Sequence, residues 1–203
     1  MDIKYSVDDN GIAYTFLNGV KGTLNQMDVE ILKYNMSKLE PNSVYVEIGS
    51  YLGCSGILAG HVMKGNALIY CHDIWFSNME ELSLESGPPP KTDDYFYKFY
   101  KNVKDNNLEH NIIPIRGDSS YTICIHGNES IDLAFIDGDH SYEGVLKDLE
   151  MIYPKMKPNS IILCHDATLG SSVDKAILEF AKSKNITDLR VHNPSSIISI
   201  VLK

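Results

Sequence analysis

The sequence predicts a single α/β domain: a mostly parallel sheet of seven strands with an antiparallel closing strand and helices on both faces. Two observations predict this fold class. Short apolar segments alternate with amphipathic segments along most of the 203 residues, and strands that alternate with helices form parallel sheets with right-handed crossovers. The last two strands are joined only by the short link from His192 to Ser196, which indicates an antiparallel pair at the sheet edge.

The composition bounds the possible functions. The net charge is −9 and no basic run occurs, which argues against a nucleic-acid partner, because phosphate binding needs concentrated Lys and Arg. No apolar run reaches transmembrane length, and the first residues lack the pattern of a secretory signal. We therefore expect a cytoplasmic protein with no membrane partner and with reduced cysteines. The sequence leaves a homo-oligomer open.

Residues 1–40 are predicted to form a lead-in and a helix that packs on the core. Asn-Gly pairs at 10–11 and 18–19 favour tight turns, so a small hairpin or an irregular lead-in is expected. A helix is expected from about Thr23 to Leu39, because Thr23 and Gln26 have the spacing of a capping box. The apolar stripe expected on this helix consists of Leu24, Met27, Ile31 and Tyr34.

Residues 41–203 are predicted to form the main domain. Strands are expected at about 44–48, 67–71, 112–115, 131–136, 160–164, 186–191 and 197–202. Helices are expected between them, with N-caps at Asp118 or Ser119, at Ser141, and at Ser171 or Ser172. The Pro-rich and aromatic segment at about 75–106 is predicted to be a lid-like insertion, because long loops in compact domains are often functional. Packing of its aromatic side chains onto the sheet is the alternative.

The segment from Val44 to Ser55 is the candidate ligand cradle. A buried strand runs into a turn that contains Gly49 and Gly53, and a helix of small and apolar residues follows. Gly49 permits a sharp turn, and Gly53 lets the backbone approach a ligand closely. Amides at the start of the helix favour electron-rich groups. The turn lacks the three glycines of the dinucleotide fingerprint.

Acidic residues follow five of the predicted strands: Glu47, Asp73, Asp118, Asp137 and Asp166. Because ligands bind at the carboxyl ends of the strands in open α/β sheets, we expect these residues on one rim. Asp73 lies about 24 residues after the glycine turn and suits the ribose hydroxyls of a nucleotide cofactor. A plain capping role stays open for Asp118.

Three motifs together resemble class I S-adenosylmethionine-dependent methyltransferases. They are E-x-G-x-x-x-G at 47–53, I-D-G-D-H-S-Y at 136–142 and C-H-D at 164–166. Within that class they resemble the small-molecule O-methyltransferases that act on macrolide sugars, such as the macrocin enzymes, and the cephalosporin-hydroxylase-associated proteins. The resemblance covers about Val44 to Thr168. It implies a Rossmann-like methyltransferase fold, S-adenosylmethionine as cofactor, and a small hydroxylated acceptor such as a sugar or natural product.

The resemblance also implies roles for residues at matching positions. The amino-acid end of the cofactor would be cradled by Glu47, Gly49, Ser50 and Gly53. Asp73 would hold the ribose, and Asp118 with Ser119 would contact the adenine. A nicotinamide-dependent oxidoreductase is the alternative on a similar sheet, and a nucleotide-binding module without turnover is a second alternative.

A divalent metal is implied at the ends of two neighbouring strands, where Asp137 and Asp166 match the family's ligand positions. His165 completes the predicted set but falls where relatives often carry a carboxylate. Imidazole suits Fe, Mn, Zn or Ni better than Mg²⁺, so the metal's identity stays open. The alternative is that His165 only packs beside Asp166.

His140 aligns with the family's general base. Its chemical case is independent, because methyl transfer to a hydroxyl requires removal of a proton and histidine titrates nearest neutral pH. The alternative is that His140 orders its own loop through Asp139 or Ser141.

Overall fold

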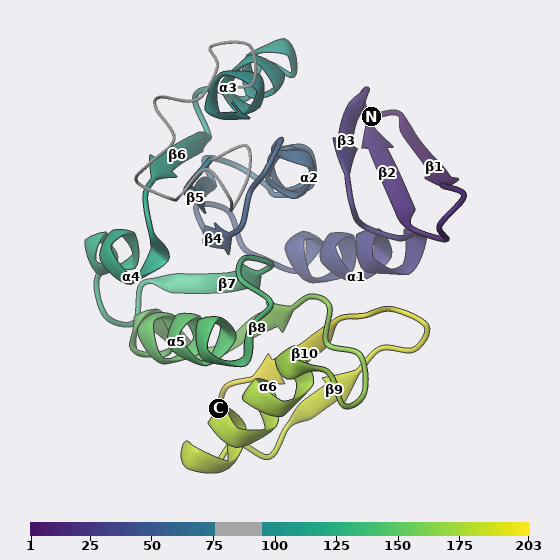
Figure 1. Cartoon of the computed structure of the whole chain (residues 1–203). Coiled ribbons are helices and arrows are strands. Elements are labelled where there is room, and N and C mark those ends of the chain that lie inside the picture. Colours follow the sequence, from purple (N-terminus) through teal and green to yellow (C-terminus); the bar gives the residue numbers. More distant parts are fainter. Residues whose placement is uncertain (76–94) are drawn as a thin grey trace, which may run out of the picture.

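The computed structural model describes residues 1–75 and 95–203 (Figure 1). Its central sheet consists of β4 (Val44–Ile48), β5 (Leu68–Asp73), β6 (Ile112–Arg116), β7 (Ile131–Ile136), β8 (Met156–Cys164), β9 (Leu189–Val191) and β10 (Ile198–Val201). The strand order is β6-β5-β4-β7-β8-β10-β9. β10 runs antiparallel to both of its neighbours, whereas the pairs among β4 to β8 are parallel. The predicted seven-stranded sheet and its antiparallel closing strand are confirmed.

Helices cover both faces of this sheet. One face carries α1 (Gln26–Ser37), α2 (Cys54–Val62) and α3 (Tyr95–Asp105), and the other carries α5 (Tyr142–Ile152) and α6 (Ser172–Ser183). Successive strand residues alternate between the two cores: Tyr45 packs in the first and Val46 in the second. Because both faces are buried, the parallel strands are nearly all apolar. α5 and α6 lie side by side (Figure 1).

Short elements connect these layers. The helix α4 (Ser119–Thr122) follows β6, and two 3₁₀ turns follow at Ile123–Ile125 and Tyr153–Lys155. Ser141 caps α5 and Ser171 caps α6, as the sequence predicts: each hydroxyl accepts a hydrogen bond from a backbone N–H three residues on.

The N-terminal residues form a three-stranded antiparallel sheet of β1 (Ile3–Val7), β2 (Ala13–Leu17) and β3 (Val20–Gly22). This meander is one strand longer than the expected hairpin. It leads directly into α1, which lies beside it in Figure 1.

The predicted start of α1 is wrong by two residues. Its N-cap is Asn25, because Asn25 and Asp28 satisfy each other's backbone N–H groups in a capping box (3.0 and 2.8 Å). The expected apolar stripe is also shifted, since Met27 and Tyr34 are exposed. The buried residues of α1 are Asp28, Val29, Ile31, Leu32 and Met36.

β8 is longer than predicted, because it begins at Met156 and so contains Pro158. A proline is tolerated there since the pairing with β7 is irregular between Met156 and Ile161. Most of the predicted lid, 76–94, lies outside the described residues. In α3, Phe99 and Val103 are buried in the core, so packing is confirmed for these two side chains. No helix in the described ranges has both the length and the apolarity that membrane crossing requires.

Candidate active site

The glycine turn after β4 is pressed against the end of β7. Gly49 has a φ of +92°, and a Cβ added there would lie 2.1 Å from the carbonyl oxygen of Asp137. Its N–H donates to the carbonyl of His72 at 2.9 Å, which ties the turn to β5 as well. Gly53 is the N-cap of α2 with a φ of +90°. Glycine at position 49 therefore allows close backbone packing of three strand ends, whereas a Cβ at Gly53 would meet the ring of Phe99 at 3.0 Å.

A cavity of about 760 Å³ opens at the carboxyl ends of β4 to β7. Its size is that of a typical small-molecule site. The predicted site residues that line it are Gly49, Asp73, Asp118, Ser119, Asp137 and His140. The glycine turn and the predicted metal-binding strand end thus share one cavity.

Asp73 is held by backbone groups at the cavity wall. Its two carboxylate oxygens accept hydrogen bonds from the N–H groups of Tyr51 (2.7 Å) and Trp75 (2.6 Å). Burial raises the pKa of Asp73 even though these bonds favour its charged form. The carboxylate is therefore fixed in direction, as a ligand-binding group requires.

Asp118 and Ser119 lie at the next strand end. Asp118 caps α4 by accepting from the N–H of Ser120 at 2.8 Å, so its capping role is confirmed beside its place in the cavity wall. The Ser119 hydroxyl donates to Asp148 Oδ1 at 2.5 Å. Contact of either residue with adenine stays a prediction.

Glu47 is fully buried and faces the core beneath α2. Its Oε2 accepts a hydrogen bond from the Tyr45 hydroxyl at 3.0 Å, and burial raises its pKa. Its Oε1 and the Ser50 hydroxyl are buried without a hydrogen-bond partner in the described part of the chain. Ser50 lines a small pocket beside the glycine turn, and Glu47 lines neither that pocket nor the large cavity. A contact between Glu47 and the cofactor stays a prediction, and the burial of Glu47 away from both pockets does not support it.

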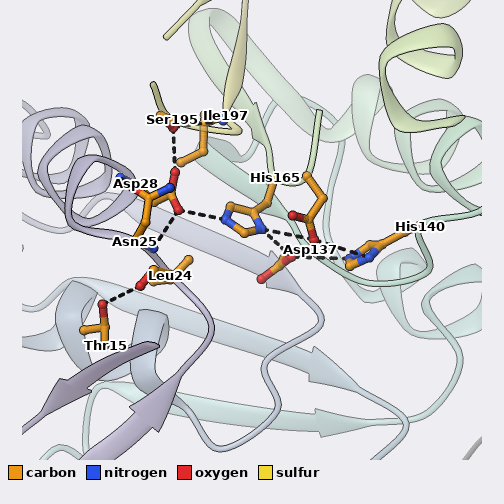
Figure 2. A network of polar contacts seen from close by, with 10 residues as sticks. Thr15, Leu24, Asn25, Asp28, Asp137, His140, His165, Ser195 and Ile197 are labelled. Carbon is orange, nitrogen blue, oxygen red and sulfur yellow. Dashed lines mark hydrogen bonds and ion pairs between the residues drawn. The ribbon is translucent and has the colours of Figure 1, made fainter. Parts of the chain in front are cut away.

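Asp137, His140 and Asp166 form a cluster at the ends of β7 and β8. Figure 2 shows Asp137 beside His140. The His140 ring lies between the two carboxylates, with Nε2 3.5 Å from Asp137 Oδ1 and Nδ1 3.3 Å from Asp166 Oδ2. Asp137 chiefly raises the pKa of His140 above its ordinary value. One potential ligand atom from each of these three residues lies within 4.8 Å of the other two, and residues 1–75 and 95–203 contain no second group of this kind. In this group His140 takes the place that the sequence prediction gave to His165, beside the predicted ligands Asp137 and Asp166.

His165 approaches the same cluster from the interior. Its Nε2 lies 3.1 Å from Asp28 Oδ2, and its Nδ1 lies 3.1 Å from Asp137 Oδ1 and 3.5 Å from Asp166 Oδ2. Burial opposes the charged ring, but the three carboxylates outweigh burial and hold the pKa of His165 well above 6.5. Among the described residues, Nδ1 has no partner at hydrogen-bonding geometry. At neutral pH the ring therefore carries a proton on both nitrogens, and a divalent cation that binds between the two carboxylates would displace the proton of Nδ1.

The sequence prediction missed two acids of this region, Asp28 and Asp148. Asp148 lies on α5, is buried, and lines the large cavity. Burial raises its pKa to about 6. A signal for it exists, since Asp148 falls on the apolar stripe of its helix, next to Leu149 and three residues after Val145. Asp28 likewise lies four residues before the buried Leu32. An acid on an apolar stripe marks a buried polar contact.

Comparison with known families decides the identity of this fold. A family model described as a methyltransferase domain matches residues 46–167, which are 122 of the 203 residues. The chain belongs to this methyltransferase family. The resemblance predicted from the three motifs is confirmed. The family match argues against the alternative of a nicotinamide-dependent oxidoreductase.

Solved structures share the fold of this methyltransferase at low sequence identity. The O-methyltransferase NovP is 15% identical, with 87% of this chain and 80% of NovP covered and a TM-score of 0.68. An O-methyltransferase from Bacillus cereus in complex with SAH is 15% identical (89% and 82% covered, TM-score 0.63). TomG from Streptomyces achromogenes, in complex with SAM, is 10% identical (89% and 82%, 0.65). No curated protein sequence matches the chain significantly.

Proposed function

We propose that this methyltransferase transfers a methyl group from S-adenosylmethionine to a hydroxyl of a small acceptor, such as a sugar or a hydroxylated natural product, with the help of a divalent cation. The observation that carries the proposal is the single cavity lined by Gly49, Asp73, Asp137 and His140. It joins a nucleotide-type cradle to a cluster of acids and imidazoles. The complexes of two structural neighbours with SAH and SAM support the choice of cofactor.

The chain's own part in cofactor binding is orientation. Gly49, Ser50 and Gly53 would cradle the amino-acid end, Glu47 would support the turn, and Asp73 would accept hydrogen bonds from ribose. Asp118 and Ser119 would face the adenine. S-adenosylmethionine supplies an electrophilic methyl group on sulfur. Because that group needs an in-line approach of the acceptor oxygen, positioning accounts for most of the rate enhancement.

Asp137, Asp166 and Nδ1 of His165 would hold the cation, which would lower the pKa of an acceptor hydroxyl bound beside it. The nitrogen ligand favours transition metals such as Mn²⁺, Fe²⁺ or Zn²⁺ over Mg²⁺. Nδ1 of His165 lies 3.1 Å from Asp137 Oδ1 and 3.5 Å from Asp166 Oδ2. This proximity supports the set, since a mixture of nitrogen and oxygen donors suits a divalent transition metal.

His140 would take the acceptor's proton. Its side chain is half exposed, which leaves the ring open to an acceptor from the solvent side. The same carboxylates that orient the ring also stabilise its protonated form. The neutral, basic ring therefore prevails only above a pKa that is higher than the ordinary value of histidine.

The test is transfer of a labelled methyl group from S-adenosylmethionine to a panel of sugars, polyols and phenols, with Mn²⁺, Mg²⁺ or a chelator. We expect product with at least one acceptor and less product with the chelator. His140→Ala should lower kcat by ~10²- to 10⁴-fold and leave the affinity for S-adenosylhomocysteine unchanged. His110→Ala, at an exposed histidine after α3, is the matched control.

Three outcomes would contradict the proposal. If calorimetry shows binding of NAD(H) but not of S-adenosylhomocysteine, the alternative of a nicotinamide-dependent oxidoreductase would be favoured. Binding of S-adenosylhomocysteine with no product from any acceptor would favour the module without turnover. Full activity of the His140→Ala variant would remove this residue from the chemistry.

A further inference from the structure

Asp28 is a buried carboxylate that holds three partners from three parts of the chain. Its Oδ2 accepts a hydrogen bond from the backbone N–H of Asn25 at 2.8 Å and lies 3.1 Å from Nε2 of His165. Its Oδ1 accepts from the hydroxyl of Ser195 at 2.6 Å. A capping box needs only the contact with the N-cap residue. The contacts with His165 and Ser195 therefore require a further explanation.

The contact with Asp28 decides which nitrogen of His165 carries a proton. A carboxylate accepts hydrogen bonds, so Nε2 must be the donor, and when a cation displaces the proton of Nδ1, that nitrogen presents a lone pair. Nδ1 lies 3.1 Å from Asp137 Oδ1 and 3.5 Å from Asp166 Oδ2. It is buried and unpaired within the part of the chain that the structure describes. Figure 2 shows the resulting row from Asp28 through His165 to Asp137 and His140.

We propose that Asp28 is a positioning residue for the metal centre. It fixes the direction and the tautomer of His165, so that Nδ1 completes the ligand set of Asp137 and Asp166. The inference rests on the proposed function in one respect, namely that a cation binds at these two aspartates. Metal-bound histidines commonly donate their other N–H to a carboxylate, and that partner raises the basicity of the ligand.

The position of Asp28 gives this arrangement a consequence for the whole fold. Asp28 on α1 and Ser195 before β10 both lie outside residues 46–167, which match the methyltransferase family. Both lie next to the site, because Asp28 contacts His165 and the Ser195 hydroxyl donates a hydrogen bond to Asp28. The Ser195 hydroxyl also accepts a hydrogen bond from the N–H of Ile197 at 2.9 Å. The segments that flank the matched domain thereby complete the site.

The test compares two variants of the full chain that each remove one partner of the network. Asp28→Asn keeps the size of the side chain and removes the charge that faces His165. Ser195→Ala removes a hydrogen bond to the same carboxylate without touching the ring. Metal-free protein is titrated with Co²⁺ alone by calorimetry and by its visible absorption, and separately with S-adenosylhomocysteine. Urea unfolding reports the stability of each variant.

We expect Asp28→Asn to weaken Co²⁺ binding by ~10- to 100-fold and to change the absorption of the bound ion. Ser195→Ala should change Co²⁺ affinity less than ~3-fold even where it lowers stability, since the lost hydrogen bond leads to Asp28 and not to the ring of His165. S-adenosylhomocysteine should bind all three proteins alike. Equal Co²⁺ affinity of Asp28→Asn and the wild type would overturn the positioning role alone. A wild type that binds S-adenosylhomocysteine but no Co²⁺ would overturn the metal centre and this inference together.

A measurement on the wild type covers the case in which Asp28→Asn does not fold. In protein labelled with ¹⁵N-histidine and loaded with ¹¹³Cd²⁺, the metal should couple to Nδ1 of His165, and Nε2 should keep its proton. Coupling to Nε2, or no coupling to this ring, would overturn the proposal.

Discussion

Replacement of Gly49 by alanine tests the contact that joins the glycine turn to the candidate metal centre. A left-handed backbone costs an alanine ~1–2 kcal/mol. The added Cβ would also lie 2.1 Å from the Asp137 carbonyl oxygen and 2.8 Å from Gly138 Cα. These are backbone atoms that no rotamer change can move aside, so β7 must shift. Overpacking of this kind costs a further ~1–3 kcal/mol or more.

The matched control is Gly19→Ala. Gly19 has a similar φ of +85°, but its added Cβ would meet no atom of the described residues within 4 Å. It therefore carries only the backbone cost, and both variants gain the same small term from a less flexible unfolded chain. The difference between the two free energies of unfolding isolates the contact with Asp137.

Urea unfolding followed by circular dichroism measures both variants. We expect Gly49→Ala to lose at least ~1–3 kcal/mol more than Gly19→Ala. It should also weaken the binding of S-adenosylhomocysteine and of Co²⁺, because Asp137 is displaced. Equal losses for the two variants would refute the close packing of the turn on β7, and with it the shared cavity.

Three further predictions concern titrating groups. Since Asp137 raises the pKa of His140, kcat/KM should increase with pH through an apparent pKa above ~6.5; a profile that is flat from pH 6 to 9 would contradict this. Asp148 has its pKa raised from 3.8 to about 6, so it destabilises the fold as pH rises through this window. Asp148→Asn should therefore be more stable than the wild type at pH 7.5, by up to about 3 kcal/mol at ~1.4 kcal/mol per pKa unit, and this advantage should vanish by pH 4. Burial lowers the pKa of His72 to about 3, so the unfolded state takes up the proton first and stability is lost as pH falls below 6.5. His72→Gln should make the pH dependence of urea unfolding between pH 6 and 5 shallower by roughly 1.4 kcal/mol per pH unit, and an unchanged slope would show that His72 is not buried neutral.

Local signals in the sequence predict most of the fold. The run of β7 was predicted with its observed bounds, Ile131–Ile136, because a strand buried on both faces is nearly all apolar, and its one acid, Asp132, lies near the start of the strand. The caps Ser141 and Ser171 were predicted because the capping hydroxyl acts within three residues. The rim of acids followed from topology, since the carboxyl ends of parallel strands meet at one edge.

Long-range contacts explain what the sequence did not predict. The buried face of α1 was misassigned because the periodicity of Met27 and Tyr34 was as good as that of the true face. The true face includes an acid whose partner, His165, lies 137 residues away. Local sequence patterns do not reveal a contact between residues so far apart in the chain. Asp148 was missed for the same reason, since its partner Ser119 lies on another element.

The proposed roles of His165 and Asp28 explain each other in terms of charge. The resemblance to relatives implies three acids around the cation, whereas this chain offers Asp137 and Asp166 with an imidazole between them and Asp28. A neutral imidazole alone would leave the site one negative charge short. Asp28 restores that charge one side chain further from the cation, where it acts through the ring. With the proposed cation bound, the site would keep the charge of a three-carboxylate centre while presenting a nitrogen donor, and the N-terminal helix would supply one of those charges through Asp28.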